Sequence, residues 1–180
     1  AEQHADYFWD ALCKACQALW PLLPIPKESI AAVSVTTQRA TAIAMGADNQ
    51  PLRPAISWLD QRQVETKPAL GALESALFTL VRAKPLVDLM HKQAEANWIA
   101  QNEPNIWDKV HKFVLLSGYH NYKLTGEYKD AVASTVGFLP FDYKTQQWAD
   151  KKDWKWRAMP ITQEMLPEVL PAGAELGRIT

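Results

Sequence analysis

The stretches VSVTTQR at residues 33–39 and ISWLDQR at residues 56–62 decide how this chain is expected to fold. Each begins with β-branched apolar residues typical of a buried strand. A strand that only fills a core usually stops at Gly, Pro, Asn or Asp. The first of these stretches stops at a Gln-Arg pair, and the second at Trp, Asp and Arg within five residues. Large polar groups at the mouth of a sheet suit recognition of a polyhydroxylated small molecule. The candidate binding residues are therefore Gln38, Arg39, Trp58 and Asp60.

Each candidate side chain has a chemistry that fits a sugar or polyol. Arg39 offers a planar fork of donors for a vicinal diol, and Gln38 both donates and accepts. Trp58 offers a flat apolar face, and Asp60 accepts hydrogen bonds from hydroxyl groups. The structural alternative is that Trp58 fills the core and that Asp60 and Arg62 form an ion pair. Since successive strand residues point to opposite faces, Gln38 and Arg39 share one pocket only if the strand ends between them.

The composition excludes several other classes of protein. The chain has 180 residues, 48% apolar and 22% charged, which is typical of one globular domain. A net charge of −1 and the lack of a basic stripe argue against nucleic-acid binding. No apolar run is long enough to span a membrane, and no signal peptide opens the chain. Two cysteines cannot form a disulfide framework, so we expect a reducing, cytoplasmic compartment.

Apolar periodicity and turn residues predict a mixed α and β module, with strands first and helices afterwards. A buried strand is predicted over Ile30–Arg39 and a second strand over Thr41–Met45. A turn at 46–51 should join the second strand to one at Ile56. Gly126 should end one of the helices. Helices are predicted at about 6–20, 61–77, 90–101, 102–114 (with Asn102 as N-cap), 116–124, 149–157 and 162–169.

Other candidate sites have simpler explanations. Cys13 and Cys16 form a C-x-x-C inside an amphipathic helix pattern, and no second Cys or His pair completes a metal site. The four histidines lack metal-ligand spacing. No phosphate-cradling glycine loop is present. Most tryptophans lie at core positions of predicted helices, which disfavours a secreted, Trp-rich carbohydrate-binding domain.

Six short segments, in order, resemble the FGGY family of sugar and polyol kinases, which includes glycerol kinase and xylulokinase. The first is Glu2-Gln3 before an aromatic-rich helix. The others are SVTTQRAT at 34–41 (like I-T-N-Q-R-E-T), PLRPAISWLDQR at 51–62 (P-x-x-x-A-I-x-W-x-D-x-R), 98–107 (W-x-x-x-x-E-P-x-x-[FW]), 115–126 (L-x-x-x-Y-x-x-Y-x-L-T-G) and 141–148 (F-D-x-x-x-x-x-W).

This resemblance implies a ribonuclease-H-like, actin-like α/β fold with a mixed sheet flanked by helices. Residues 1–180 would form part of the N-terminal, sugar-binding domain. The family's first β-hairpin with its phosphate loop, its catalytic aspartate and its ATP domain would lie outside this chain. The resemblance places the sugar against Gln38-Arg39 and Trp58. ATP and Mg²⁺ would be used by the full-length enzyme, and no catalytic residue is expected in this chain.

Three further expectations follow from the resemblance. The isolated chain should be inactive, because phosphoryl transfer depends on positioning and on neutralising charge at the γ-phosphate. Its partners would be a sugar or polyol and the remainder of the kinase, with homodimerisation through an exposed sheet edge. Ala40 replaces the Glu that glycerol kinases carry after Gln-Arg, which disfavours glycerol as substrate. The alternative function is a non-catalytic sugar-binding or regulatory module of the same fold.

Overall fold

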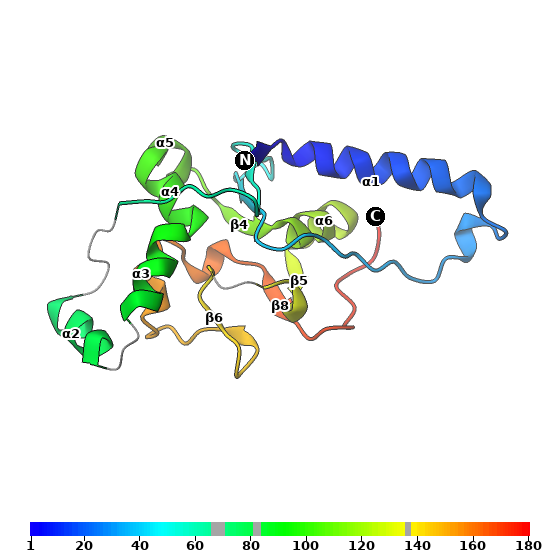
Figure 1. Cartoon of the computed structure of the whole chain (residues 1–180). Coiled ribbons are helices and arrows are strands. Elements are labelled where there is room, and N and C mark those ends of the chain that lie inside the picture. Colours follow the sequence, from blue (N-terminus) through cyan, green and yellow to red (C-terminus); the bar gives the residue numbers. More distant parts are fainter. Residues whose placement is uncertain (66–70, 81–83, 136–137) are drawn as a thin grey trace.

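A computed structural model describes residues 1–65, 71–80, 84–135 and 138–180, and these residues form a layered α/β structure around one antiparallel sheet (Figure 1). In the sheet, β2 lies between β3 and β4, and β1 pairs with the outer side of β3. Ala42 of β2 stands opposite Leu115 of β4, and Met45 stands opposite Lys112. The strands are β1 (Glu2–Gln3), β2 (Ala42–Met45), β3 (Ala55–Ile56) and β4 (Lys112–Leu115).

Alternation along the strands divides the core between the two faces of this sheet. Ile43 and Met45 of β2 pack with α1 (Ala5–Leu19) and α6 (Leu116–Thr125). Ala42 and Ala44 face the other side, where they belong to a cluster with α3 (Lys84–Gln93), α4 (Glu95–Asn102) and residues 159–166. Because side chains in a strand point to alternate faces, β2, β3 and β4 each contribute to both clusters. The predicted α/β class, with helices flanking a sheet, is confirmed.

The remaining elements form smaller units around this centre. β5 pairs in parallel with β8, and β6 pairs antiparallel with β7. The helical elements are η1 (Trp20–Leu22), η2 (Lys27–Ser29), α2 (Ala72–Leu80), α5 (Pro104–Trp107), η3 (Val132–Ser134), α7 (Lys155–Ala158) and η4 (Gln163–Met165). The strands are β5 (Lys129–Ala131), β6 (Phe141–Asp142), β7 (Gln147–Trp148) and β8 (Glu168–Leu170).

Elements with strong local signals are where the sequence places them. The helix predicted at 6–20 is α1, and the strand predicted at 41–45 is β2. The helix predicted at 116–124 is α6, and it ends at Gly126, whose φ of 75° is the left-handed conformation that glycine adopts most easily.

The buried strand predicted over Ile30–Arg39 is wrong. From Ile30 onward this segment is extended but forms no strand, and most of its residues are exposed. The described residues offer no backbone hydrogen-bond partner to the N–H groups of residues 31–37. A strand needs a paired neighbour, so β-branched composition alone does not bury this segment.

Several helix predictions also need correction. Residues 61–65 are not helical, α2 begins only at Ala72, and residues 66–70 of the prediction lie outside the described residues. The predicted helix at 102–114 is only the four-residue α5, since Phe113 and Val114 pair with β2 instead. Around 149–157 only α7 is helical, and the segment predicted as 162–169 forms η4 followed by β8.

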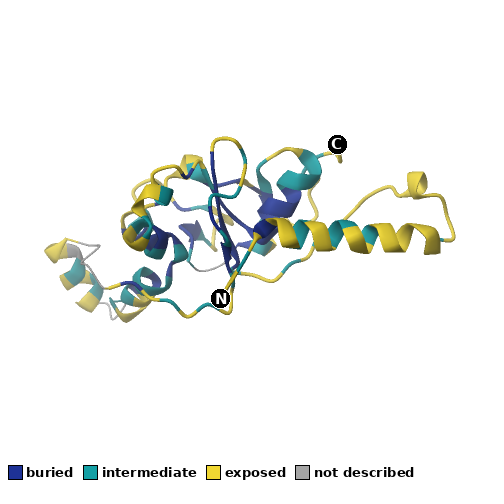
Figure 2. Cartoon of the chain, turned by 90° about the horizontal axis from the view of Figure 1, so that it is seen from above, coloured by how far each residue is buried: buried dark blue, intermediate teal, exposed yellow. Residues whose placement is uncertain are grey.

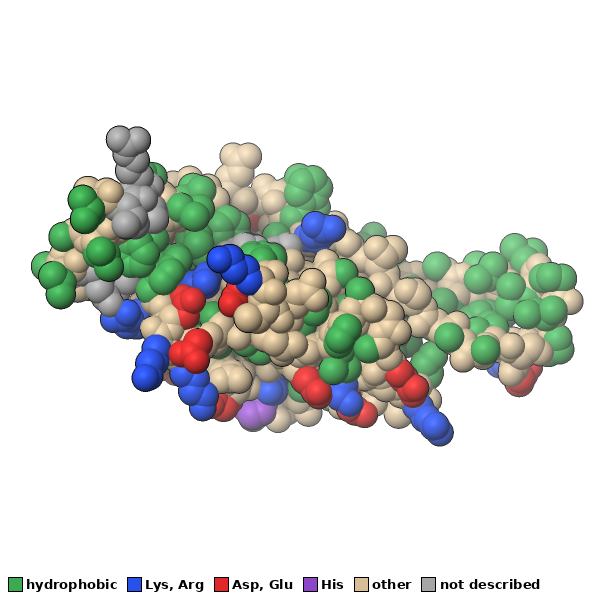
Figure 3. All heavy atoms as spheres, turned by 90° about the horizontal axis from the view of Figure 1, so that it is seen from below, with side chains coloured by type: hydrophobic (Ala, Val, Ile, Leu, Met, Phe, Trp, Pro, Cys, Tyr) green, Lys and Arg blue, Asp and Glu red, His purple; other side chains and the backbone are tan. Residues whose placement is uncertain are grey.

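One end of the molecule exposes apolar side chains. The second half of α1 and the residues after it extend away from the sheet and are largely exposed (Figure 2). Figure 3 shows hydrophobic side chains gathered at this end. They include Leu19, Trp20, Leu22, Ile25 and Ile30. Within the described part of the chain, no helix is long and apolar enough to cross a membrane.

Candidate functional site

The two predicted binding segments meet at the hydroxyl group of Thr41. The Gln38 side-chain amide donates a hydrogen bond from Nε2 to Thr41 Oγ1 at 3.0 Å. The backbone N–H of Trp58 donates to the same oxygen at 3.4 Å. Thr41 is fully buried immediately before β2, and its carbonyl oxygen accepts the Leu116 N–H at 3.0 Å. The fold thus brings Gln38 and Trp58, twenty residues apart in sequence, to one point at the end of the sheet.

The backbone at Ala40 turns the chain between Arg39 and Thr41. Its φ of 55° lies in the left-handed region, which costs a non-glycine residue about 1–2 kcal/mol. Strained backbone of this kind is typical of functional sites. Because no strand continues through this point, the alternation that would place Gln38 and Arg39 on opposite faces of a sheet does not apply.

Trp58 and Arg39 are both accessible. Trp58 is 55% exposed, so it does not fill the core. Arg39 is also exposed, and it forms no hydrogen bond or ion pair with the residues that the structure describes. Burial raises the pKa of Tyr143, and the positive charge of Arg39 opposes this rise. The turn after β6 therefore lies within electrostatic range of Arg39, a proximity that the sequence does not indicate.

Asp60 lies beside these residues, but its carboxylate is already engaged. Arg62 donates to it from Nε at 2.7 Å, from Nη2 at 2.8 Å and from its backbone N–H at 2.8 Å, and the Ala1 amino group also contacts it. These contacts, chiefly the Arg62 hydrogen bond, hold the pKa of Asp60 well below its usual range. The occupied oxygens favour the structural ion pair over direct sugar binding. Substrate binding by Asp60 stays a prediction.

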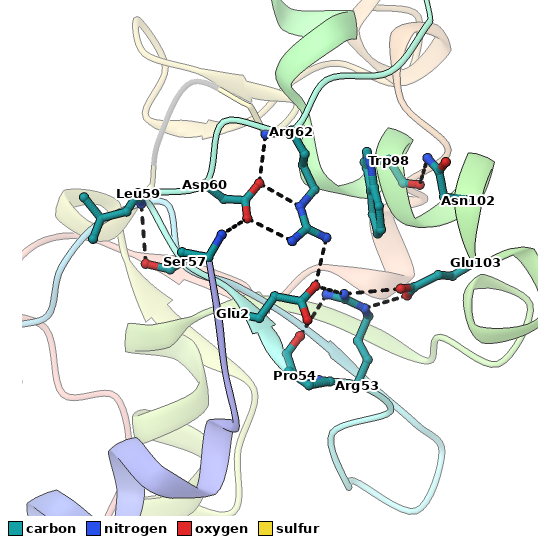
Figure 4. A network of polar contacts seen from close by, with 11 residues as sticks. Glu2, Arg53, Pro54, Ser57, Leu59, Asp60, Arg62, Trp98, Asn102 and Glu103 are labelled. Atoms are coloured by element: carbon teal, nitrogen blue, oxygen red, sulfur yellow. Dashed lines mark hydrogen bonds and ion pairs between the residues drawn. The ribbon is translucent and has the colours of Figure 1, made fainter.

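Behind Asp60 lies a network of ion pairs that joins four parts of the chain (Figure 4). The buried Arg53 side chain donates from Nε to Glu103 Oε2 at 2.6 Å and also contacts Glu2. Arg62 Nη1 lies 2.8 Å from the same Glu2 oxygen, and its guanidinium lies 4.1 Å from the centre of the Trp98 ring. Burial alone would raise the pKa of Glu2, but the two guanidinium groups outweigh burial and lower it.

Glu95, the first residue of α4, is a half-buried acid next to this network. Loss of hydration raises its pKa to about 7, and the negative charge of Asp60 adds to the rise. Its own backbone N–H and the charge of Arg62 act in the opposite direction but are weaker. Nothing in the sequence around Glu95 distinguishes it from a surface glutamate on a helix.

A separate surface cavity of about 480 Å³ lies between α4 and residues 157–160, and none of the four predicted residues lines it. His91 and Asn97 are held at its wall, since His91 Nδ1 lies 3.1 Å from the Ala158 carbonyl oxygen and Asn97 Nδ2 donates to that oxygen at 3.0 Å. The predicted site is an exposed surface at the sheet end rather than part of this cavity.

Sequence reasoning missed three residues of the candidate site region. Thr41 belongs to a motif in which the neighbouring Gln38 and Arg39 are the obvious binding residues. Glu95 is far from that motif in sequence, and Tyr143 follows the short hairpin strand β6. Thr41 is the one that a sequence signal could have revealed, because it directly follows the Gln-Arg-Ala turn. Among the described residues, no group of three His, Cys, Asp or Glu side chains could hold a metal ion.

Comparisons with known proteins match the whole chain to one family. The model of the FGGY family of carbohydrate kinases, N-terminal domain, matches residues 1–180. A glycerol kinase of Thermococcus kodakarensis is 26% identical over 174 residues, which cover 93% of this chain and 34% of that protein. A xylulose kinase of Lactococcus lactis is 24% identical, covering 98% of this chain and 34% of that protein. The chain thus spans about a third of the length of the curated relatives it matches.

Solved structures share the fold at lower sequence identity. A gluconate kinase from Lactobacillus acidophilus superposes with a TM-score of 0.73 at 18% identity, covering 100% of this chain and 35% of that chain. A xylulose kinase from Rhodospirillum rubrum superposes with a TM-score of 0.69 at 18% identity, covering 100% of this chain and 37% of that chain.

Proposed function

The chain belongs to the FGGY family of carbohydrate kinases, and from this premise we propose that the longer protein phosphorylates a sugar or polyol with ATP. The observation that carries the proposal is the match of all 180 residues to the family's N-terminal domain. We assign the sugar-binding wall to this chain. The chemistry itself, including the phosphate loop and the catalytic aspartate, we assign to the remainder of the protein.

The geometry of the site supports specific roles in binding. With its Nε2 donating to Thr41, Gln38 retains Oε1 as an acceptor for a sugar hydroxyl. Arg39 can donate to two adjacent hydroxyl oxygens, and the exposed ring of Trp58 can pack against sugar C–H groups. Asp60 acts together with Arg62, which orients its carboxylate. All four side chains bind or orient the substrate and do not move a proton in the reaction.

ATP with Mg²⁺ is the proposed phosphoryl donor, and it supplies the transferable group and the charge neutralisation that the reaction needs. The described residues contain no cluster that fits a metal ion, so no step of the reaction is assigned to a metal site here. We assign the binding of Mg²⁺ and ATP to the longer protein. Use of ATP is consistent with a cytoplasmic enzyme.

An assay of the full-length protein tests the proposed function. Glycerol, xylulose and gluconate, each named by a relative, are offered with ATP, and release of ADP is measured. We expect turnover with at least one of them, with glycerol disfavoured because Ala40 offers no side-chain partner for a hydroxyl. The isolated 180-residue chain should show none. Turnover by the isolated chain would refute our division of roles, and no turnover by the full-length protein with any of these three compounds would refute the kinase proposal.

Replacing Arg39 by alanine in the full-length protein should raise the sugar KM at least tenfold. The reason is that the guanidinium supplies two of the donors that hold the sugar, and tenfold corresponds to about 1.4 kcal/mol. Steady-state kinetics at saturating ATP measures the effect. Arg178→Ala, which removes a 95%-exposed arginine side chain, is the matched control. An unchanged KM for Arg39→Ala would exclude Arg39 from the site.

The runner-up is a non-catalytic sugar-binding or regulatory module of the same fold. It would bind one of these sugars without releasing ADP, so a calorimetric binding measurement alongside the assay separates the two functions. Homodimerisation also stays a prediction, and light scattering on the purified protein tests it.

A further inference from the structure

We propose that Thr41 is a positioning residue of the sugar-binding wall, because its hydroxyl oxygen holds the Gln38 amide and the Trp58 backbone in one arrangement. The inference rests on the proposed function and adds a residue to it. Thr41 itself is fully buried and cannot touch the sugar. It acts through the segments that contain Gln38 and Trp58, which can contact the sugar.

The backbone of Thr41 is held in place by one hydrogen bond of its own and by the sheet pairing of the next residue. Its carbonyl oxygen accepts the Leu116 N–H at 3.0 Å. The next residue, Ala42, pairs with Ile56 of β3 and with Leu115 of β4. The hydroxyl group therefore projects from a residue next to the doubly paired Ala42 toward two segments that have little regular structure of their own.

The hydrogen bonds assign a direction to the Gln38 side chain. A hydroxyl oxygen accepts two hydrogen bonds, and at Thr41 Oγ1 these come from Gln38 Nε2 and the Trp58 N–H. Since the amide nitrogen of Gln38 faces Thr41, its carbonyl oxygen Oε1 is the atom left for a ligand. Oε1 forms no hydrogen bond with the described residues. The wall thus presents an acceptor at Gln38 beside the donors of Arg39.

One oxygen atom serves both segments, so its removal should release both at once. Gln38 and Arg39 are exposed, and Trp58 is 55% exposed, so packing alone holds these side chains weakly. Ordering loosely held side chains when a ligand binds weakens affinity. Loss of the Thr41 hydroxyl should therefore weaken sugar binding while leaving the phosphoryl-transfer step unchanged.

The test compares Thr41→Val with Thr41→Ser in the full-length protein. Valine keeps the shape of threonine without the hydroxyl, and serine keeps the hydroxyl. Sugar affinity is measured by calorimetry without ATP, using whichever of glycerol, xylulose and gluconate binds best to the unmodified protein, and kcat and KM are measured with ATP. Thr41→Val should raise Kd and KM at least fivefold and leave kcat within twofold. Thr41→Ser should stay within twofold in all three.

Thr135→Val is the matched control, since Thr135 is also buried and its hydroxyl donates to the Val132 carbonyl oxygen at 2.8 Å, outside the site. It should leave Kd unchanged. Hydrogen exchange adds a readout that a general loss of stability would not reproduce. Thr41→Val should speed exchange in the segment that contains Trp58 and leave the β6–β7 hairpin unchanged.

An unchanged Kd in Thr41→Val would overturn the inference, as would equal weakening in Thr41→Ser and Thr41→Val. These outcomes are distinct from failure of the kinase proposal. If the unmodified protein binds a sugar but does not phosphorylate it, the kinase proposal fails, and the Kd values still decide the role of Thr41. If it binds none of the three sugars, both proposals fail together.

Discussion

Replacing Arg53 by alanine is expected to lower the free energy of unfolding by about 3 kcal/mol, the loss typical of breaking a buried ion pair by removing one partner. The Arg53 side chain is 4% exposed and lies between Glu2 and Glu103. Its removal leaves two partly buried carboxylates facing each other without the shared cation. Urea unfolding followed by tryptophan fluorescence measures the change.

Two further variants identify the cause of that loss. Arg53→Lys keeps the charge but loses the two-point contact with Glu103, so it should recover only part of the stability. Arg178→Ala removes an arginine whose side chain is 95% exposed and should change stability by less than about 0.5 kcal/mol. If Arg53→Ala were no more destabilising than Arg178→Ala, the network would have no role in stability.

Replacing Glu95 by glutamine is expected to stabilise the protein above pH 7 and to have little effect near pH 4.5. Burial raises the pKa of Glu95 in the folded state to about 7, against 4.5 for an unperturbed glutamate. This gap corresponds to at most about 3 kcal/mol. Because the residue is not fully buried, we expect about 1–2 kcal/mol.

The sign follows from proton binding. Between pH 4.5 and pH 7 the folded protein keeps a proton on Glu95 that the unfolded chain has already lost. Stability therefore falls as the pH rises through this window. Glutamine cannot ionise and removes this fall. The lowered pKa values of Glu2 and Asp60 act only below the window, because their stabilising charge is lost when the pH falls toward their folded-state pKa values.

The measurement is urea unfolding at several pH values from 4.5 to 8.5 for both proteins. Burial lowers the pKa of His120 from its usual 6.5, which adds stability as the pH rises toward 6.5 and so overlaps the Glu95 window, but this contribution is common to both proteins and cancels in their difference. Glu28→Gln, at an exposed position in η2, is the matched control and should show no pH-dependent difference. A constant difference between Glu95→Gln and the unmodified protein at all pH values would contradict the prediction.

The correct sequence predictions share a physical basis. α1 has an apolar face with a helical period, and α6 ends at a glycine that adopts a left-handed backbone. Those signals are local, so the two helices form without depending on which distant residues pack against them. The failed predictions concern segments whose state depends on a distant neighbour. Phe113 and Val114 fit a helix by spacing, but β2 is available to pair with them and they form a strand.

The sequence by itself determined the family, the α/β class and the candidate binding residues, because these depend on residue types and their order. Only the tertiary structure decided which of those residues meet. It joined Gln38 and Trp58 through the buried hydroxyl of Thr41, and it occupied the Asp60 carboxylate with Arg62. It also left the β-branched segment after Ile30 without a strand partner among the described residues. The reason is physical: hydrogen bonds and ion pairs depend on positions in space, and a pattern along the chain does not specify which distant partner is within reach.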